Sequence, residues 1–445
     1  MKNSHIILLF ILAVNCSSCG KFLDIEPKGI IIPKKVSDYE GILNSPTMNN
    51  TFPIDILVLT DDNFNNFDNT DQSARANEYY WRPVITLNEK SNPEIWGSSY
   101  RAIYDANVII SGILTATNGT DAQKQSILAE ALVIRANSLL DLLTVFAKAY
   151  NPSTADSDPG LPLVISTNVT DKIPKRSSVK LTLNTLINDV SNAVNALPLS
   201  NVNRYRVSKY AAYGLLSRIY LYMADYPNAK KYAEMALQAP NTLLNYNNYA
   251  SSNQVPIYDL NPEVLWQRAS VSGDPTFMLY SSDLKTYFDS SDIRYQFLTV
   301  TNNDGLGRAG FLGNKYNFGI TFPEMYLTKA EMLAREGRFQ DAIDIVNMLR
   351  KNRIRTVDYV DQTAATSEEA LVKVLAERRR ELAYSSTRWF DMKRLDQEGR
   401  MPEVKRINKD SHEVEASLPP HSPNYTFEIP TRVLMFNPGM ELNRK

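Results

Sequence analysis

Aromatic and amide side chains that could bind a sugar gather in one short part of the chain. Tyr79-Tyr80-Trp81 forms an aromatic run, and it follows an Asn- and Asp-rich stretch that includes Asp62 and Asn66. Sugar C–H faces pack on Trp and Tyr rings, while sugar hydroxyls pair with amide and carboxylate groups. These residues form the first candidate site, although a tyrosine taken alone more often packs in a core.

A second candidate site lies in the stretch 241–323, which also carries aromatic residues and a Gly-rich loop. Its side chains that could contact a ligand are Tyr280, Tyr287, Phe288, Tyr295, Arg308 and Tyr316. Recognition residues concentrate on loops that a rigid scaffold holds in place. We therefore expect the site on these irregular segments and not on helices.

Catalytic side chains are few in this sequence. Asp61 and Asp62 could supply a glycosidase carboxylate, but that chemistry needs two carboxyl groups held roughly 5–9.5 Å apart across a cleft. Adjacent aspartates in an Asn-rich loop are more typical of turns or of weak cation binding. His412 and His421 stand in no metal-ligand spacing and near no nucleophile motif. We predict no catalysis, no cofactor and no metal site, and we keep a glycoside hydrolase as an alternative.

The N-terminal residues predict export and lipid attachment. Lys2 precedes a short apolar run at residues 6–14, and two serines then precede Cys19-Gly20. The run is shorter than the about 20 residues that a membrane-spanning helix needs, so it indicates a secretory signal. Small residues before a cysteine and a glycine are typical of a bacterial lipobox. We predict that residues 1–18 are a lipoprotein signal peptide and that Cys19 is acylated, which anchors the protein in a membrane.

Composition narrows the class of protein further. Cys16 and Cys19 are the only cysteines, so the mature chain can form no disulfide and must rely on its core. With 445 residues, 43% of them hydrophobic, the chain is long enough to bury a large core. Its 48 basic and 49 acidic residues include no basic block, so we expect no nucleic-acid partner.

Apolar periodicity predicts helices over much of the chain. Apolar residues recur at helical spacing in 96–110 and again in 121–149, where Asp121 is the expected N-cap. A further helix is expected at 183–197, and 263–268 is the best strand candidate. The chain before the first of these helices is expected to form ordered loops.

Two segments match the spacing of a tetratricopeptide repeat, which is a pair of antiparallel helices. The first is 213–236, where Ala229 and Ala236 allow close helix approach, and the second is 326–349, with Gly337 at the turn. We predict a mostly α fold. It consists of a tetratricopeptide-like scaffold of at least three helix pairs, an irregular loop-rich lobe and a few short strands.

Several motifs together resemble the SusD/RagB family, in the order in which that family has them. They are Glu377-Arg378-Arg379-Arg380-Glu381-Leu382-Ala383-Tyr384, Arg388-Trp389-Phe390-Asp391-Met392-Lys393-Arg394, Phe22-Leu23-Asp24 and Asn437-Pro438-Gly439. One departure is Ser385-Ser386-Thr387, which stands where the family usually has a Glu-Gly pair. Within this signature we expect Arg388 to pair with Asp391 and Trp389 to lie in the core.

The resemblance implies a cell-surface lipoprotein of the Bacteroidetes outer membrane that binds glycans and does not cleave them. Family members sit as a lid on a TonB-dependent (SusC-like) transporter and pass captured oligosaccharide inward. The expected partners are therefore an oligosaccharide, that transporter and the outer membrane, reached through a lipid anchor that faces the cell exterior. A peptide or another nutrient as ligand, or a purely protein-docking scaffold, remains the alternative.

The expected domain organisation is a single SusD-like domain at residues 19–445. Its parts are an N-terminal tether and loop-rich region at 19–95, helical repeats at 96–240, an irregular insertion at 241–323, and a helical repeat with the C-terminal signature at 324–445.

Overall fold

The computed structural model describes residues 33–49, 52, 54–168, 172–270, 279–301, 307–309 and 316–444. The signal segment and Cys19 lie outside these residues, so acylation stays a prediction. Within the described residues, no helix is long and apolar enough to cross a membrane.

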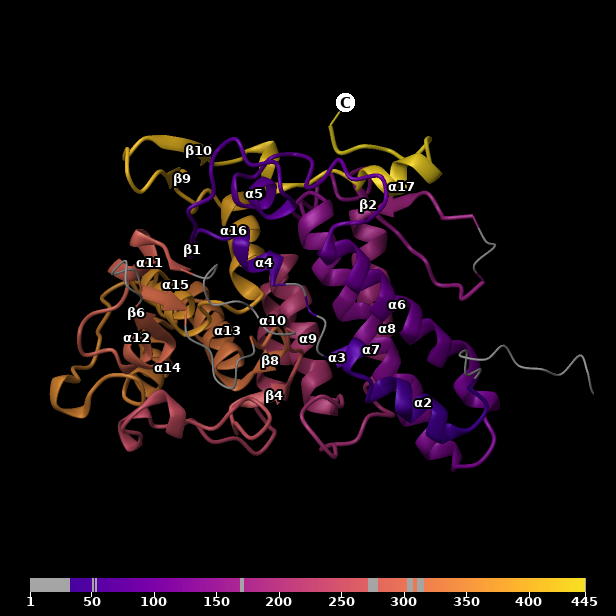
Figure 1. The fold of residues 1–445 in the computed structure, drawn as a ribbon. Helices are drawn as coiled ribbons and strands as arrows, with labels where there is room; N and C mark the ends of the chain where they lie inside the picture. The colour runs from indigo at the N-terminus through magenta and orange to yellow at the C-terminus, as the bar shows by residue number, and fades with distance from the viewer. Residues whose placement is uncertain are drawn as a thin grey trace, which may run out of the picture.

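Antiparallel helices form the body of the molecule, and the predicted mostly α class is confirmed (Figure 1). The long helices are α6 (Glu94–Gly112), α7 (Asp121–Phe146), α8 (Val179–Ala193), α9 (Lys209–Tyr222), α10 (Tyr226–Ala236), α13 (Phe322–Arg335), α14 (Phe339–Arg350), α15 (Ser367–Glu381) and α16 (Thr387–Gln397). The helices α6 to α8 lie at one side of the molecule, and α13 to α15 lie at the other.

The helix predicted to begin with an Asp121 N-cap begins one residue earlier. Thr120 is the N-cap of α7, because its hydroxyl accepts a hydrogen bond from the Gln123 backbone while the Gln123 side chain bonds back to the Thr120 backbone. This reciprocal capping box satisfies two backbone donors at the helix start. Asp121 lies in the first turn, where its negative charge is favourable.

Both predicted repeat segments are helical hairpins. In the first, the small residues Ala229, Ala233 and Ala236 of α10 are fully buried, and the Ser217 hydroxyl of α9 donates to the Ala229 carbonyl at 2.8 Å. In the second, Gly337 joins α13 to α14 with a φ of 86°, a left-handed conformation that glycine adopts without strain. Close approach of small residues is therefore what holds these helix pairs together.

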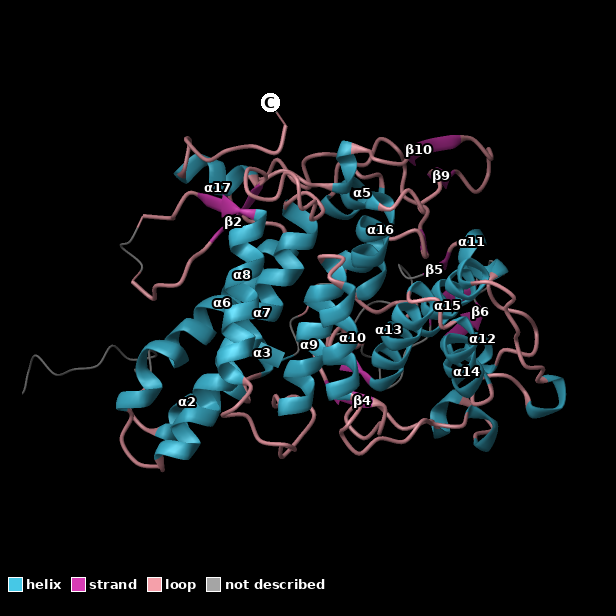
Figure 2. Ribbon diagram, turned by 180° about the vertical axis from the view of Figure 1, so that it is seen from behind, coloured by secondary structure: helices cyan, strands magenta, loops and turns pink. Residues whose placement is uncertain are grey.

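Strands are short and lie at the periphery of the helical body (Figure 2). One antiparallel sheet has the order β1 (Asn63–Phe64), β5 (Leu279–Tyr280), β7 (Gly307–Ala309) and β6 (Thr299–Thr301). The other strands form antiparallel pairs, namely β2 (Pro159–Pro162) with β3 (Arg176–Ser178), β4 (Val264–Trp266) with β8 (Ile320–Thr321), and β9 (Val404–Ile407) with β10 (Val414–Leu418). The strand expected at 263–268 is thus present as β4.

The region before α6 contains more helix than the sequence suggested. Its Asn and Asp residues favour turns, but apolar residues between them fold into short helices that pack on the core. These are α2 (Val36–Leu43), α3 (Pro46–Asn49), α4 (Asp55–Val58) and α5 (Ala74–Tyr79). Later short helices are α11 (Ser282–Thr286), α12 (Ile293–Leu298) and α17 (Thr431–Phe436).

Gly319 stands where the β4–β8 pair meets the helical body, and it has no room for a side chain. A Cβ atom at Gly319 would lie 1.9 Å from the Trp266 carbonyl oxygen, a backbone atom that cannot move aside. Gly97, in contrast, is exposed in the interior of α6, and a Cβ there would meet nothing within 4 Å.

We expect Gly319→Ala to destabilise the fold by roughly 1–3 kcal/mol, as overpacking does. Gly97→Ala is the matched control and should stabilise by about 0.5–1 kcal/mol, because alanine is the better helix former. Unfolding in urea measures both values. Equal stability of the two variants would contradict this account of the β4–β8 junction.

Candidate functional site

The two candidate sites predicted from the sequence lie next to each other in the structure. Strand β1, in the Asn- and Asp-rich loop, pairs antiparallel with β5 of the insertion, with Asn63 opposite Tyr280 and Phe64 opposite Leu279. Segments more than two hundred residues apart in the chain therefore lie side by side (Figure 1). From the sequence alone, the two regions were alternative sites, because no sequence pattern indicates that β1 pairs with β5.

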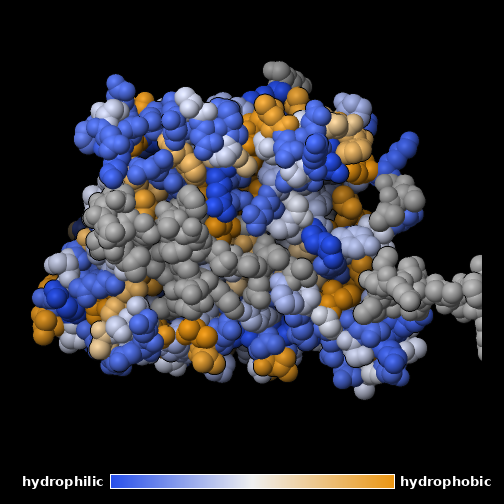
Figure 3. All heavy atoms as spheres, in the orientation of Figure 1, coloured by the Kyte–Doolittle hydropathy of each residue, from blue (hydrophilic) through white to orange (hydrophobic). Residues whose placement is uncertain are grey.

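A groove of about 640 Å³ opens beside the paired strands. We call it the hairpin groove; its walls come from the N-terminal loop, from residues 280–285 and from residues 402–412 of the β9–β10 hairpin. The wall residues of the N-terminal loop and of α5 are Asp61, Asn63, Phe64 and Tyr79. Phe64 is half-buried in its wall, and Ser281, Asn408 and Lys409 add polar groups. Hydrophilic residues cover the part of the molecule where the hairpin lies, at the upper left of Figure 3. The groove thus combines aromatic and hydrogen-bonding surface.

Aromatic rings of the insertion form the floor beneath the groove. Tyr280 is 2% exposed, and its ring stacks on that of Tyr384 with centroids 5.1 Å apart. Phe288 and Tyr295 pack on Tyr280 at 6.1 and 5.9 Å. These second-candidate residues are therefore mostly packing residues that support the groove from below.

Trp81, the centre of the first candidate site, lies in the core. Its side chain is fully buried, and its indole N–H donates to the Leu59 carbonyl at 2.8 Å. Trp81 also has a φ of 51°, which is unusual for a residue with a side chain. In this structure no sugar can reach the ring, so the expectation of a stacking surface at Trp81 is not met.

The other residues of the first candidate site differ in how deeply they are buried. Tyr79 and Tyr80 are 1% and 5% exposed, and the Tyr80 hydroxyl lies within hydrogen-bond distance of two acceptors, the Phe67 carbonyl and Glu415 of the hairpin. Asp62 is buried, whereas Asn66 is exposed. Of this set only Tyr79 lines the hairpin groove. The predicted cluster therefore stands next to the groove and supports it, but does not form its surface.

Arg406 of β9 explains why these rings are buried. Its guanidinium lies 4.0 Å from the Tyr79 ring centroid and 4.1 Å from that of Trp81, the range of a cation–π contact. The same group donates to the carbonyls of Tyr79, Asn63, Val58 and Thr60. Burial lowers the pKa of Arg406. A single buried cation thus fixes the hairpin against the whole loop.

Asp61 and Asp62 form ion pairs with the C-terminal signature. Asp61 receives a bidentate pair from Arg388 at 2.7 and 2.5 Å, and Asp62 accepts from Arg379 at 2.8 Å. Burial would raise the pKa of Asp61, but Arg388 and Arg379 outweigh it and hold that pKa well below its ordinary value. These carboxylates are therefore committed to arginines.

The expected pairing of Arg388 with Asp391 is wrong. Asp391 instead accepts from Arg378 at 2.8 Å and from Arg394 at 2.7 Å, all within the buried signature. Arg388 turns toward the N-terminal loop because Asp61 offers it two carboxylate oxygens in fork geometry. Trp389, which we expected in the core, is fully buried.

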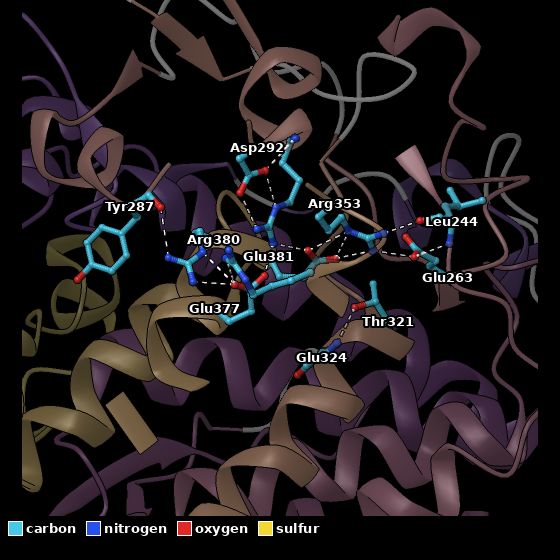
Figure 4. A network of polar contacts seen from close by, with 12 residues as sticks. Leu244, Glu263, Tyr287, Asp292, Thr321, Glu324, Arg353, Glu377, Arg380 and Glu381 are labelled. Carbon is cyan, nitrogen blue, oxygen red and sulfur yellow. Dashed lines mark hydrogen bonds and ion pairs between the residues drawn. The ribbon is translucent and has the colours of Figure 1, made fainter. Parts of the chain in front are cut away.

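The signature helix α15 also ties down the insertion (Figure 4). Arg353 lies between Glu263 and Glu381, at 2.7 Å from each carboxylate, and Arg380 pairs with Glu377 at 2.7 Å. Arg353, Glu263, Arg380 and Glu377 are buried, and the Glu381 side chain is 6% exposed. Breaking a buried pair by removing one partner strongly destabilises a protein, because a lone charge is left without water.

Among the described residues, no cluster of three or more His, Cys, Asp or Glu side chains is arranged to hold a metal ion. What the arrangement offers is a groove with aromatic and polar walls, held in place by buried arginines.

A comparison with protein families accounts for both halves of the chain. Residues 21–221 match a family model described as "Starch-binding associating with outer membrane", and residues 218–444 match the SusD family model. The chain belongs to the SusD family. The second match includes the signature helices α15 and α16, so the family's C-terminal motif is the arginine-rich segment that anchors the groove.

Individual relatives are distant. A SusD-like protein P25 from Formosa agariphila is 25% identical over 293 residues, which is 60% of this chain and 51% of that protein. The chain thus spans about half the length of this curated relative. A SusD superfamily protein from Bacteroides thetaiotaomicron is 20% identical, with a TM-score of 0.74 over 92% of this chain and 100% of the other. Surface glycan-binding protein A from Bacteroides uniformis is 15% identical, with a TM-score of 0.70 over 92% and 98%. These structures share the fold.

The burial of Trp81 changes the expected result of its replacement. We expect Trp81→Ala to cost about 3–5 kcal/mol of unfolding free energy, as for other large core residues. Leu87, which is 76% exposed, provides the control, since Leu87→Ala should change stability little. Thermal or urea unfolding measures both. An unchanged melting temperature for Trp81→Ala would place the ring outside the core.

The signature also makes stability depend on pH. Burial would raise the pKa values of Glu331 and Glu377, but Arg394 and Arg294, respectively, lower both to about 2. Because these folded-state pKa values lie below the ordinary value of 4.5, the stabilisation is complete above that pH and is lost as pH falls toward 2.

We therefore expect the unfolding free energy to fall steeply between about pH 4.5 and pH 2.5, and less steeply in Glu377→Gln, which lacks one such carboxylate. Glu336→Gln, at an exposed position, is the control and should keep the wild-type slope. Parallel pH profiles for all three proteins would show that the buried pairs do not govern acid stability.

Proposed function

We propose that this protein captures an oligosaccharide in the hairpin groove and does not cleave it. The observation that carries the proposal is the groove itself, about 640 Å³ in volume, with Phe64 and Tyr280 beside polar groups of the hairpin. Small-molecule sites in proteins have volumes of roughly 300–1,000 Å³ and combine apolar walls with a few placed polar groups. The description of the matching family as starch-binding supports a glycan as the ligand.

The helix pairs are a poorer place for the site. Their small and large apolar residues are committed to the core, whereas the groove lies on loops and short strands that the helices hold in position. Recognition surfaces concentrate on such segments. The committed ion pairs of Asp61 and Asp62 account for these carboxylates without any role in hydrolysis.

We further propose that the protein is anchored to the outer face of the outer membrane by lipid on Cys19. It would deliver its ligand there to a TonB-dependent transporter of the SusC-like kind. The residues around Cys19 support the anchor, and the family description, which places the family at the outer membrane, supports the location. Delivery rests on family membership.

Binding can be tested by incubating the protein with panels of oligosaccharides and of peptides, followed by calorimetry on any ligand found. We expect micromolar-to-millimolar affinity, about −8 to −4 kcal/mol, for an oligosaccharide. A peptide ligand alone would overturn the glycan assignment, and released reducing ends would overturn the claim of no cleavage.

Phe64 and Phe67 offer a matched pair of variants in the same loop. Both rings are half-buried, but Phe64 lines the groove whereas Phe67 packs on Tyr79 with centroids 5.6 Å apart. We expect Phe64→Ala to weaken glycan binding roughly tenfold, since an aromatic contact contributes about 0.5–1.5 kcal/mol beyond its buried area. Phe67→Ala should leave affinity unchanged. Unaltered binding in Phe64→Ala would exclude this groove.

A further inference from the structure

The charged side chains that line the hairpin groove do not balance one another. Among the described residues of its wall, cationic side chains outnumber carboxylates. The cations are Lys285, Lys405, Arg406 and Lys409, and the carboxylates are Asp61, Asp283 and Glu403. A charged wall selects a ligand of opposite charge only where the wall charge has no partner within the protein. The partners of each wall group therefore decide which charge a ligand meets.

Each of these carboxylates already has a cationic partner. Asp283 pairs with Arg379 at 2.7 Å, and Glu403 pairs with Lys405 of the same hairpin at 3.3 Å. Asp61 is held by an arginine of α16. The described wall thus has no carboxylate left unpaired that would repel an anionic ligand.

Two of the wall cations are committed in the same way, and two are not. Lys405 belongs to the pair with Glu403, and Arg406 is buried with its N–H groups on backbone carbonyls. Lys285 and Lys409, in contrast, form no ion pair and no side-chain hydrogen bond with the described chain. The excess positive charge of the groove therefore lies on these two lysines.

Lys285 is the more informative of the two. It lies in α11, and its side chain is half-buried in the groove wall. Burial lowers its pKa, and no carboxylate of the described chain counteracts that effect. A cation that loses water without gaining a counter-charge is unfavourable, and a bound anion would remove that cost. Lysines on an open surface keep their water and give no such indication.

Lys409 stands on a different wall of the same groove. It is exposed in the turn of the β9–β10 hairpin, which lies above α11 in Figure 1. Asp410 and Glu413 belong to the same turn but do not line the groove. A chain bound in the groove would thus meet one unpaired cation on each of two walls.

We propose that the ligand of the hairpin groove is an acidic oligosaccharide, whose carboxylate or sulfate groups pair with Lys285 and Lys409. This inference rests on the proposed capture of a glycan in the same groove, and it names the class of that glycan. Acidic sugars keep the C–H face that packs on an aromatic ring, so Phe64 retains its contact. A neutral oligosaccharide would fill the groove but leave Lys285 without a counter-charge.

Calorimetry on the full chain with three kinds of tetrasaccharide tests the class. The neutral probes are maltotetraose and cellotetraose, the carboxylated probe is tetragalacturonate, and the sulfated probe is a carrageenan tetrasaccharide. We expect an acidic probe to bind roughly tenfold more tightly than either neutral one, because charge-assisted hydrogen bonds are about twice as strong as neutral ones. Comparison of the two acidic probes identifies which anionic group the lysines prefer.

The possible failures are distinguishable. A neutral tetrasaccharide that binds as tightly as the acidic probes would overturn the acidic class and leave glycan capture intact. Inorganic sulfate that binds as tightly as an acidic probe would reduce the groove to a simple anion site and overturn this inference. If no oligosaccharide binds, glycan capture itself fails, and the acidic class fails with it.

Salt provides a second measurement on the same proteins. Affinity for an acidic probe should fall roughly threefold or more between about 50 and about 500 mM NaCl, because salt screens charges that water can reach. Affinity for a neutral probe should not change. An acidic probe with salt-independent affinity would contradict pairing with the exposed Lys409.

Lys285 and Lys209 form a matched pair of variants. Both are half-buried and form no ion pair with the described chain, but Lys209, at the start of α9, lies outside the groove. We expect Lys285→Gln to weaken binding of the acidic probe roughly tenfold, and Lys209→Gln to leave it unchanged. Neither replacement breaks an ion pair, so both variants should melt close to wild type. Equal affinities of the two variants would overturn the role of Lys285.

Lys409 and Lys90 form a second pair, of exposed lysines in turns. Lys90 does not line the groove and forms no ion pair with the described chain. Reversal of charge in Lys409→Glu should weaken the acidic probe and leave a neutral probe unaffected, since like charges repel. Lys90→Glu should change neither affinity. If Lys409→Glu weakens both probes alike, the lysine supports the shape of the hairpin and does not select charge.

Discussion

Buried charge is the constraint on which the rest of this structure depends. The signature helix α15 places consecutive arginines in the interior, and each must find a carboxylate because a lone buried charge is prohibitively costly. Arg379 finds Asp61 and Asp62 of the N-terminal loop, and Arg378 finds Asp391 of the next helix. Regions distant in sequence are thereby fixed in one register, which hydrophobic packing alone does not impose.

Buried arginine contacts of this kind also fix the shape of the hairpin groove. The loop that forms one wall is held from below by Arg379 and Arg388, and from the side by Arg406, which binds carbonyls along the loop. Loops are usually the mobile part of a site. Here the loop backbone is anchored by guanidinium groups, so the wall that carries Phe64 is held in one position.

The sequence predicted the helix pairs well because their information is local. The spacing of large and small residues in 213–236 lies within one segment and needs no knowledge of the rest of the chain. The site could not be derived in this way. Arg406 and the Tyr79 carbonyl that it binds lie 327 residues apart in the chain, and without that contact a buried Trp81 cannot be told from an exposed one. Asp61 was interpreted as a turn residue for the same reason, because its partner Arg388 lies 327 residues further along the chain.

The two ends of the β9–β10 hairpin have different roles. Its base carries Arg406, which the core requires, whereas its tip carries exposed residues such as Lys409 and His412 that rim the groove. Mutations at the tip are thus uncoupled from folding. If the groove binds the ligand as proposed, a lineage that meets a new nutrient can change the tip residue by residue and so alter ligand choice, while selection on stability acts only on the base.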